Sequence, residues 1–545
     1  MSQKSSPLTF RPSQVHNPRN AFDLSHHSYF TAPTGMLQPC YTCDLIPGDF
    51  LKLDVSNFTR TVPVNTAAFA RLTEHVDFYF VPYRLVWRWF DDMIVSMQNT
   101  DSAYNPNGVN IPYSVPLVST STLLAMLSTT RTDIHGYPLK FFVWRLLDQL
   151  GFPVAASYDD TIALYGADGP LAGKQWNPIR LFAFMRLYHD YYRNSDFEIN
   201  DPMAYNLDNL STGASITVTN YDPFLNNLGY CYKQWSKDLC TSIKPSSLYQ
   251  ANGVGGPITY AYYGPKGTTT TDGNNVYLST PAGNEVDVSV NGLRNIFAID
   301  KLARISMLAP KTYRDQLQAH FGVSPDNCQY CSCKFLGSFD SNIQIGDVVA
   351  TATGSDGTNS NVLGQMAGKG ISSCRLNQPI NFTASEHGVV IGIHYVQPQS
   401  EYDSNQIDKF NIKFCRSDYF IPEFDDLGLQ PLTVGQCGVK KGVSGLPENV
   451  VGYQSRYIEY KTAVDQCHGL FQSSGTLRNW SISRGNENAL AQGWQTRWLH
   501  INPNVTKSIF PMVFNGDPNT DSYLCHYRFD VTKVSNMSVN GIPML

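Results

Sequence analysis

The sequence has few charged residues. Asp, Glu, Lys and Arg together make up 16% of its 545 residues, whereas soluble proteins average about 25%. The formal net charge is −5, which argues against a generally basic nucleic-acid-binding protein. Because interfaces between subunits are depleted in charge at their centres, the low charge suits a protein whose surface is largely covered by other subunits.

Long apolar runs are also missing, and the first residues lack the apolar core of a signal peptide. We therefore expect synthesis in the cytosol and no insertion into a membrane. A reducing compartment does not sustain disulfides, so the twelve cysteines are expected to be free thiols.

Turn-forming and aromatic residues are abundant, with 40 Gly, 32 Pro and 12% aromatic residues. This balance is typical of a mainly β protein with long loops. Residues 73–81 alternate, with Val76, Phe78 and Phe80 on one face, which predicts a half-buried strand. Pro82 should end that strand because proline has no N–H to donate.

Other stretches predict further elements of both kinds. Alternating or continuous apolar patterns predict strands at residues 51–55, 389–393 and 523–532. Apolar residues at helical spacing predict helices at residues 139–150, 178–194, 291–309 and 311–321. The large apolar groups at Trp87 and Trp89 must be buried against something big, in the same chain or in a neighbouring copy.

Several longer phrases of distinctive sequence follow one another along the chain. They include D-F-Y-F-V-P-Y-R-L-V-W (77–87), F-T-A-S-E-H-G-V-V-I-G-I (382–393), R-S-D-Y-F-I-P-E-F-D-D-L-G-L-Q (416–430) and V-G-Y-Q-S-R-Y-I-E-Y-K (451–461). These phrases resemble the major capsid proteins of microviruses, the small icosahedral single-stranded-DNA bacteriophages, especially the gokushovirus-like branch. The resemblance runs from about residue 20 to the C-terminus. It fades at residues 251–285, 328–333 and 339–376.

The resemblance implies an eight-stranded antiparallel jelly roll of the viral capsid type, with long loop and helical insertions. Residues 1–35 would be an N-terminal arm on the inner face of a shell, and residues 36–545 a single capsid domain. Within that domain, residues 251–285 and 339–376 would be variable loops.

The implied function is structural. Copies would self-associate into a T=1-like icosahedral shell, assembled in the host bacterial cytoplasm, that encloses circular single-stranded DNA. A small basic DNA-packaging protein and a host-surface receptor are further expected partners. No catalytic residue, cofactor or metal is expected.

Two sets of residues are candidate contact sites. Lys4, Arg11 and Arg19 lie in the arm before much acid appears and would meet DNA phosphates; the alternative is a disordered, solvated tail. Tyr260, Tyr262 and Tyr263 lie among small polar residues in 251–285. That mixture is also used by binding loops and would contact the host surface; the alternative is an ordered loop between subunits.

Cysteine spacing leaves a metal site open. Cys40 and Cys43, and Cys328, Cys331 and Cys333, have spacings compatible with zinc. Nothing in the sequence shows that the two groups meet, so free thiols are the default expectation.

Other chemistry is weakly supported. Residues 364–370 have the wrong spacing for a phosphate-binding P-loop. Glu386 and His387 are adjacent, so an acid–base pair there is disfavoured relative to a hydrogen-bonded histidine at a turn. A carbohydrate-binding or carbohydrate-cleaving jelly-roll protein would share the composition, but the missing signal peptide and the lack of a separated acid pair disfavour it.

Overall fold

The computed structural model describes most of the chain. The described residues are 19–64, 68–95, 115–208, 215–216, 221–246, 297–302, 304–306, 313–322, 332–349, 355–356, 359–360, 366–425, 428–438, 449–484, 494–510 and 521–539.

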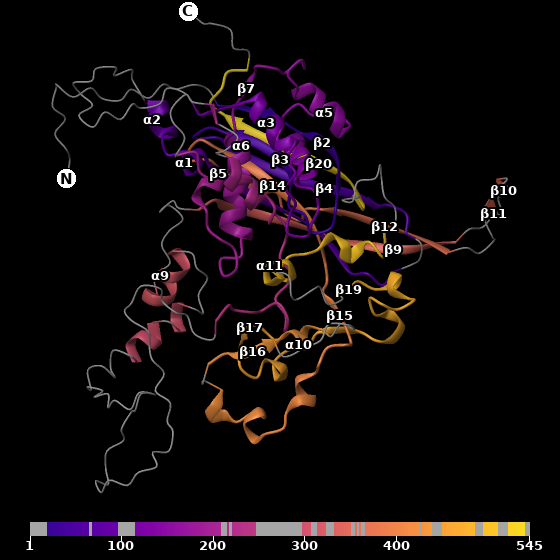
Figure 1. Cartoon of the computed structure of the whole chain (residues 1–545). Helices are drawn as coiled ribbons and strands as arrows, with labels where there is room; N and C mark the ends of the chain where they lie inside the picture. Colours follow the sequence, from indigo (N-terminus) through magenta and orange to yellow (C-terminus); the bar gives the residue numbers. More distant parts are fainter. Residues whose placement is uncertain are drawn as a thin grey trace, which may run out of the picture.

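One antiparallel sheet of ten strands organises the molecule (Figure 1). Its main path runs through β1 (Asn20–Asp23), β20 (Tyr523–Ser535), β4 (Phe50–Thr61), β12 (Met366–Arg375), β9 (Lys334–Val349), β5 (Leu72–Pro82), β14 (Gly388–Pro398) and β3 (Gln38–Leu45). Two strands lie off this path: β2 (His26–Ala32) pairs with β20 and β13 (Ile380–Thr383) with β4. The sheet curls, so that the ring of His26 on β2 stacks on that of Tyr41 on β3, 5.9 Å between centroids.

Alternation of apolar and polar residues explains which face of each strand lies inside the curl. On β4, Leu51, Leu53 and Val55 are buried between partly or fully exposed neighbours, as predicted. On β20, every second residue from Tyr523 to Val531 is buried, which confirms that prediction too. These side chains form the core enclosed by the curled sheet.

Strand β14 is buried on both faces over nearly its whole length, and β5 is so from Val76 onward. The prediction of a half-buried strand at 73–81 therefore holds only at its start, where Thr73 and His75 are partly exposed, and was wrong for the rest. Phe78 and Phe80 face the enclosed core, whereas Tyr79 and Val81 join a second core outside the curl. The residue types on the two faces of β5 differ because one face packs against other strands of the sheet and the other face packs against helices. The strand ends at Pro82, as predicted.

Helices build this second core, called here the helical core, over the side of β5 and β14 that faces away from the enclosed core. They are α1 (Tyr83–Val86), α3 (Thr120–Leu127), α4 (Leu139–Gln149), α5 (Tyr158–Tyr165), α6 (Ile179–Leu187), which continues as the π-helix Tyr188–Tyr192, and α7 (Asp222–Leu228). The helices predicted at 139–150 and 178–194 are thereby confirmed. Trp87, directly after α1, is fully buried in this core. Further along, residues 297–302 and 304–306 are helical, and α9 spans Tyr313–Phe321.

A third, smaller core lies around Tyr402 and Trp498. The parallel strands β15 (Glu401–Asp403), β18 (Asp465–Cys467) and β19 (Ser483–Arg484) contribute to this region, with the pair β16 (Gln430–Thr433) and β17 (Val450–Gln454), and with α10 (Val434–Cys437) and α11 (Trp494–Leu499). The remaining short elements are α2 (Phe90–Val95), β6 (Leu117–Ser119), β7 (Gln175–Trp176), β8 (Ser215–Ile216), β10 (Ser355–Asp356) and β11 (Asn359–Ser360).

Two predicted boundaries need correction. Where the structure describes residues 339–376, they are mostly strand rather than loop, because β9 and β12 pair with each other inside the sheet. The predicted arm, 1–35, is also part of the sheet from Asn20 onward, since β1 and β2 both pair with β20. The mainly β class and the helical insertions are confirmed.

Candidate functional site

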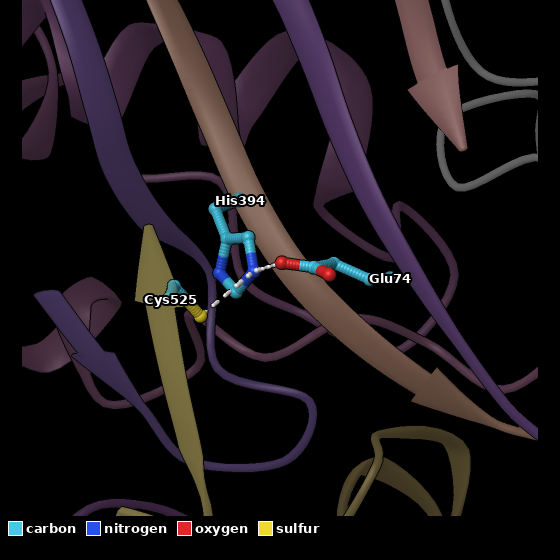
Figure 2. Close-up of side chains that lie close together, drawn as sticks. All are labelled: Glu74, His394 and Cys525. Carbon is cyan, nitrogen blue, oxygen red and sulfur yellow. Dashed lines mark hydrogen bonds and ion pairs between the residues drawn. The ribbon is translucent and has the colours of Figure 1, made fainter. Parts of the chain in front are cut away.

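A buried polar cluster lies in the enclosed core, where three strands far apart in sequence meet (Figure 2). Glu74 comes from β5, His394 from β14 and Cys525 from β20. The imidazole Nε2 of His394 lies 3.0 Å from Glu74 Oε1 and 3.8 Å from the Sγ of Cys525. The glutamate and histidine are 0% exposed and the cysteine 3%, so the curl of the sheet removes the whole cluster from water.

Neighbouring donors surround the Glu74 carboxylate. Thr59 and Tyr527 donate to Oε1, and the amide of Asn57 donates to Oε2 at 2.8 Å. Burial alone would raise the pKa of Glu74, but the hydrogen bond and charge of His394, with the bonds from Tyr527 and Thr59, outweigh it. The pKa of this carboxyl therefore lies below its ordinary value, and the carboxylate stays ionised in the core.

The cluster has the residue types of a nucleophile, a base and an acid, but its thiol is not activated as a nucleophile. Burial, reinforced by the charge of Glu74, raises the pKa of the Cys525 thiol well above its ordinary value. A reactive cysteine needs the opposite shift and access for a substrate. The arrangement therefore stabilises the fold instead of attacking a substrate.

A metal ion also fits poorly. The three ligand atoms lie within 4.8 Å of one another, but Glu74 Oε1 already accepts hydrogen bonds from Thr59 and Tyr527 besides its contact with His394. A metal would have to displace these donors and deprotonate a thiol whose pKa is raised. The donor set suits hydrogen bonding.

The two groups of cysteines considered for zinc are not gathered into one site among the described residues. Cys40 belongs to the enclosed core and Cys333 to the helical core, on the other side of the sheet. Cys43 is partly buried on β3, and Cys328 and Cys331 lie outside the described residues.

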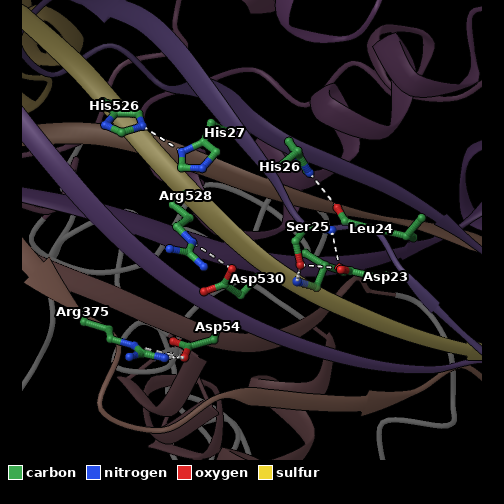
Figure 3. A network of polar contacts seen from close by, with 11 residues as sticks. Asp23, Leu24, Ser25, His26, His27, Asp54, Arg375, His526, Arg528 and Asp530 are labelled. Carbon is green, nitrogen blue, oxygen red and sulfur yellow. Dashed lines mark hydrogen bonds and ion pairs between the residues drawn. The ribbon is translucent and has the colours of Figure 1, made fainter.

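The opposite, solvent-facing side of β2, β4, β12 and β20, called here the outer sheet face, carries polar and aromatic side chains. Figure 3 shows several of the polar ones, among them His526, Arg528 and Arg375. Tyr29 stacks on His526 with 4.4 Å between ring centroids, and Nδ1 of His27 lies 3.0 Å from Nε2 of the same imidazole. Two arginines nearby are paired with acids: Arg528 with Asp530, 2.9 Å, and Arg375 with Asp54, 2.6 Å. The face therefore carries charges of both signs.

Of the predicted DNA-facing residues, only Arg19 lies in the described part of the chain. Its guanidinium donates to the carbonyl oxygen of Gly48 at 2.6 Å, in the turn that precedes β4. Lys4, Arg11 and the predicted host-contact residues Tyr260, Tyr262 and Tyr263 all lie outside the described residues.

The candidate acid–base pair Glu386 and His387 does not operate as one. Glu386 is held by Arg84, whose Nε lies 2.5 Å from Oε2, while the ring of His387 packs near Phe90 at 5.7 Å between centroids.

The adjacent acids Asp159 and Asp160 lie in the first turn of helix α5, where the side chain of Ser157 accepts a hydrogen bond from the backbone N–H of Asp160. Both observations support structural roles.

Sequence reasoning missed Glu74, His394 and Cys525 as partners. Glu74 and Cys525 lie in strands that the sequence predicted, and His394 directly follows a third, but only the register of β5, β14 and the opposite β20 brings the three side chains together. One signal was present: a histidine inside a continuous apolar strand needs a buried partner.

Among the described residues, no helix has both the length and the apolar character needed to cross a bilayer.

Comparison with known proteins places the chain. A family model described as "Capsid protein (F protein)" matches residues 12–146 and 151–545. "Capsid protein VP1" of Bdellovibrio phage phiMH2K is 22% identical over 563 residues, covering 97% of this chain and 96% of the relative. "Capsid protein VP1" of Chlamydia phage 1 is 22% identical over 596 residues, with the same coverage.

These matches confirm the resemblance to microvirus capsid proteins. They also indicate a structural, non-enzymatic role and a place in the virion. The chain belongs to the capsid protein (F protein) family.

Proposed function

We propose that this chain self-assembles into a T=1-like icosahedral shell that encloses circular single-stranded DNA. The observation that carries the proposal is the family match, which spans nearly the whole chain. The curled antiparallel sheet supports the further proposal that its core is an eight-stranded jelly roll, an architecture that limits exposed strand edges. Assembly takes place in the cytoplasm of the bacterial host.

Particle size tests this proposal. Purified chain, examined by size-exclusion chromatography and electron microscopy over a range of concentrations, should form uniform closed particles above a threshold concentration. A chain that stays monomeric at every concentration, with or without single-stranded DNA, would contradict the proposed shell.

The N-terminal arm is proposed to meet the packaged DNA through Lys4, Arg11 and Arg19, a contact with phosphates that salt weakens. Replacing all three with Ala should lower DNA retention more than shell formation. Because Arg19 also holds the turn at Gly48, a Lys4→Ala/Arg11→Ala variant serves as the control that leaves this turn intact. Equal loss of shells and DNA in that control would make the arm an assembly element instead. Three charges cannot neutralise a genome, so a small basic DNA-packaging protein would share the task.

Residues 251–285, with Tyr260, Tyr262 and Tyr263, are proposed to contact a receptor on the host surface. Shortening residues 264–275 should leave shells intact and reduce attachment to host cells, measured by adsorption of particles. Failure of shells to form after this deletion would place the segment between subunits and remove the receptor proposal.

A further inference from the structure

Large apolar side chains gather on the surface in the segments around residues 410–420 and 458–460, which belong to the orange part of the chain that Figure 1 draws near β16 and β17. We call this surface the aromatic patch. Its members, each at least 40% exposed, are Phe410, Ile412, Phe414, Tyr419, Phe420 and Tyr460. Phe414 is 84% exposed. The patch is built from two phrases that the sequence singled out, 416–430 and 451–461, and from the residues just before the first.

Three rings of the patch, those of Phe410, Tyr419 and Tyr460, meet around Lys413, which lies next to Ile412 and Phe414 in the sequence. The ammonium of Lys413 lies 4.4 Å from the ring centroid of Phe410, 4.0 Å from that of Tyr460 and 5.8 Å from that of Tyr419. The rings of Phe410 and Tyr460 are 4.9 Å apart, and those of Phe420 and Tyr460 6.4 Å. Cation–π contacts of this kind hold the rings together without covering their outer faces.

Hydrogen bonds and ion pairs hold the backbone beneath the patch. Lys413 Nζ lies 2.8 Å from Glu459 Oε1, and Gln430 donates to Glu459 Oε2 at 2.9 Å. The carboxylate of Asp418 accepts from the backbone N–H groups of Phe414 and Cys415 at 3.0 and 2.8 Å. The backbone that carries these rings is therefore held in place before any partner arrives, which lowers the entropic cost of binding.

The size and composition of the patch match the centre of a protein interface. Aromatic side chains expose about 150–250 Å² each when free, so the observed exposures amount to roughly 600 Å² of mostly apolar surface. That is at the upper limit for a patch left bare on a monomer, about 300–600 Å², and most of the roughly 800 Å² that one partner buries in a standard interface. Charged residues at the edge, with Lys461 paired to Asp425 at 3.2 Å, supply a polar rim.

We propose that the aromatic patch is a contact surface for a second copy of this chain. The proposal rests on the proposed shell and adds to it the residues that make one of its interfaces. Single-stranded DNA is the less favoured occupant, because a stacking platform for DNA also needs a positively charged groove. Here acids accompany the lysines around the patch: Lys413, 7% exposed, lies against Glu459, as does Lys409 at 3.9 Å, and Lys461 is paired with Asp425.

Substituting one exposed ring tests the proposal. Phe414→Asp places a charge at the most exposed member of the patch, and Ile199→Asp is the matched control, since Ile199 is also 84% exposed but lies outside the patch. Both variants should give folded subunits by circular dichroism. Phe414→Asp should lower the yield of closed particles at least about tenfold, whereas the control should assemble at wild-type yield. Normal assembly of Phe414→Asp would overturn the proposal.

Cys415 provides a second measurement on the unmodified protein, because it is exposed beside Phe414. Maleimide labelling of Cys415, followed by peptide mass spectrometry, should be fast in free subunits and at least about tenfold slower in particles. Equal rates in both states would overturn the proposal even if Phe414→Asp failed to fold.

Absence of wild-type particles would instead reject the proposed shell. The patch would then be judged by sedimentation: a sedimentation coefficient that rises with concentration for wild type, and not for Phe414→Asp, would still support it. Coefficients that are equal at all concentrations would reject it.

Discussion

Replacing Glu74 with Gln removes the charge of the buried carboxylate while leaving its size nearly unchanged. The side chain accepts from four groups: Asn57, Thr59, Tyr527 and His394. The glutamine amide retains one acceptor oxygen and presents an N–H₂ group to the others. Because a buried donor that loses its acceptor costs about 1–3 kcal/mol, the substitution should lower the free energy of unfolding by on the order of 3 kcal/mol.

The assay is denaturant unfolding of unassembled subunits at neutral pH, followed by tryptophan fluorescence and circular dichroism to check that the transitions coincide. Glu386→Gln is the matched control, because its partner Arg84 and Glu386 itself are about one quarter exposed and a partly solvated pair contributes about 0–1 kcal/mol. Equal unfolding free energies for Glu74→Gln and wild type would refute the argument that the buried carboxylate stabilises the fold.

The lowered pKa of Glu74 also determines how the stability difference between wild type and Glu74→Gln depends on pH. A carboxyl whose folded pKa lies below the unfolded value, about 4.3, contributes its full stabilisation above that value. This contribution is lost as the pH falls through the folded pKa. The gap in stability between wild type and Glu74→Gln should therefore be largest near neutral pH and shrink in acid; a gap that widens below pH 4 would contradict the assignment.

Two further substitutions test the packing. Trp87→Ala should cost about 3–5 kcal/mol and abolish soluble, assembled protein, because Trp87 is fully buried in the helical core; near-normal particle yield would show that this side chain is not needed there. Gly388→Ala should cost about 1–3 kcal/mol, since a Cβ would lie 2.5 Å from the carbonyl oxygen of Val81. Gly346→Ala is its control, because no described atom other than those of its chain neighbours lies within 4 Å of the added Cβ, and equal stability of the two variants would refute the predicted clash.

The sequence predicted elements whose burial follows a simple period. The strands at Leu51–Val55 and Tyr523–Val531 carry large apolar groups at every second position, and the helices at 139–150 and 178–194 carry them at helical spacing. Strands β9 and β12 were missed because they are rich in Gly, Ser, Asn and Asp, residues that favour turns. Long pairing with each other and with the neighbouring strands overrides that local preference.

The candidate sites were harder to predict for a different reason. The cluster of Glu74, His394 and Cys525 depends on how the sheet curls, which brings β20 opposite β5 and β14. No local pattern encodes that approach. The same limit applies to the aromatic patch, where Phe420 and Tyr460 come from two phrases that the sequence recognised separately.

The buried cluster around Glu74 and the exposed aromatic patch meet two different requirements of a shell-forming subunit. The buried one is polar, and its hydrogen bonds to Glu74 link β4, β5, β14 and β20, so a shifted strand register would leave buried donors without acceptors. The exposed one is mostly apolar, and Glu459 and Asp418 bind Lys413 and the backbone N–H of Phe414 within it. A subunit that joins identical copies needs both features: a fold that admits one register, and an apolar surface whose burial awaits its neighbours.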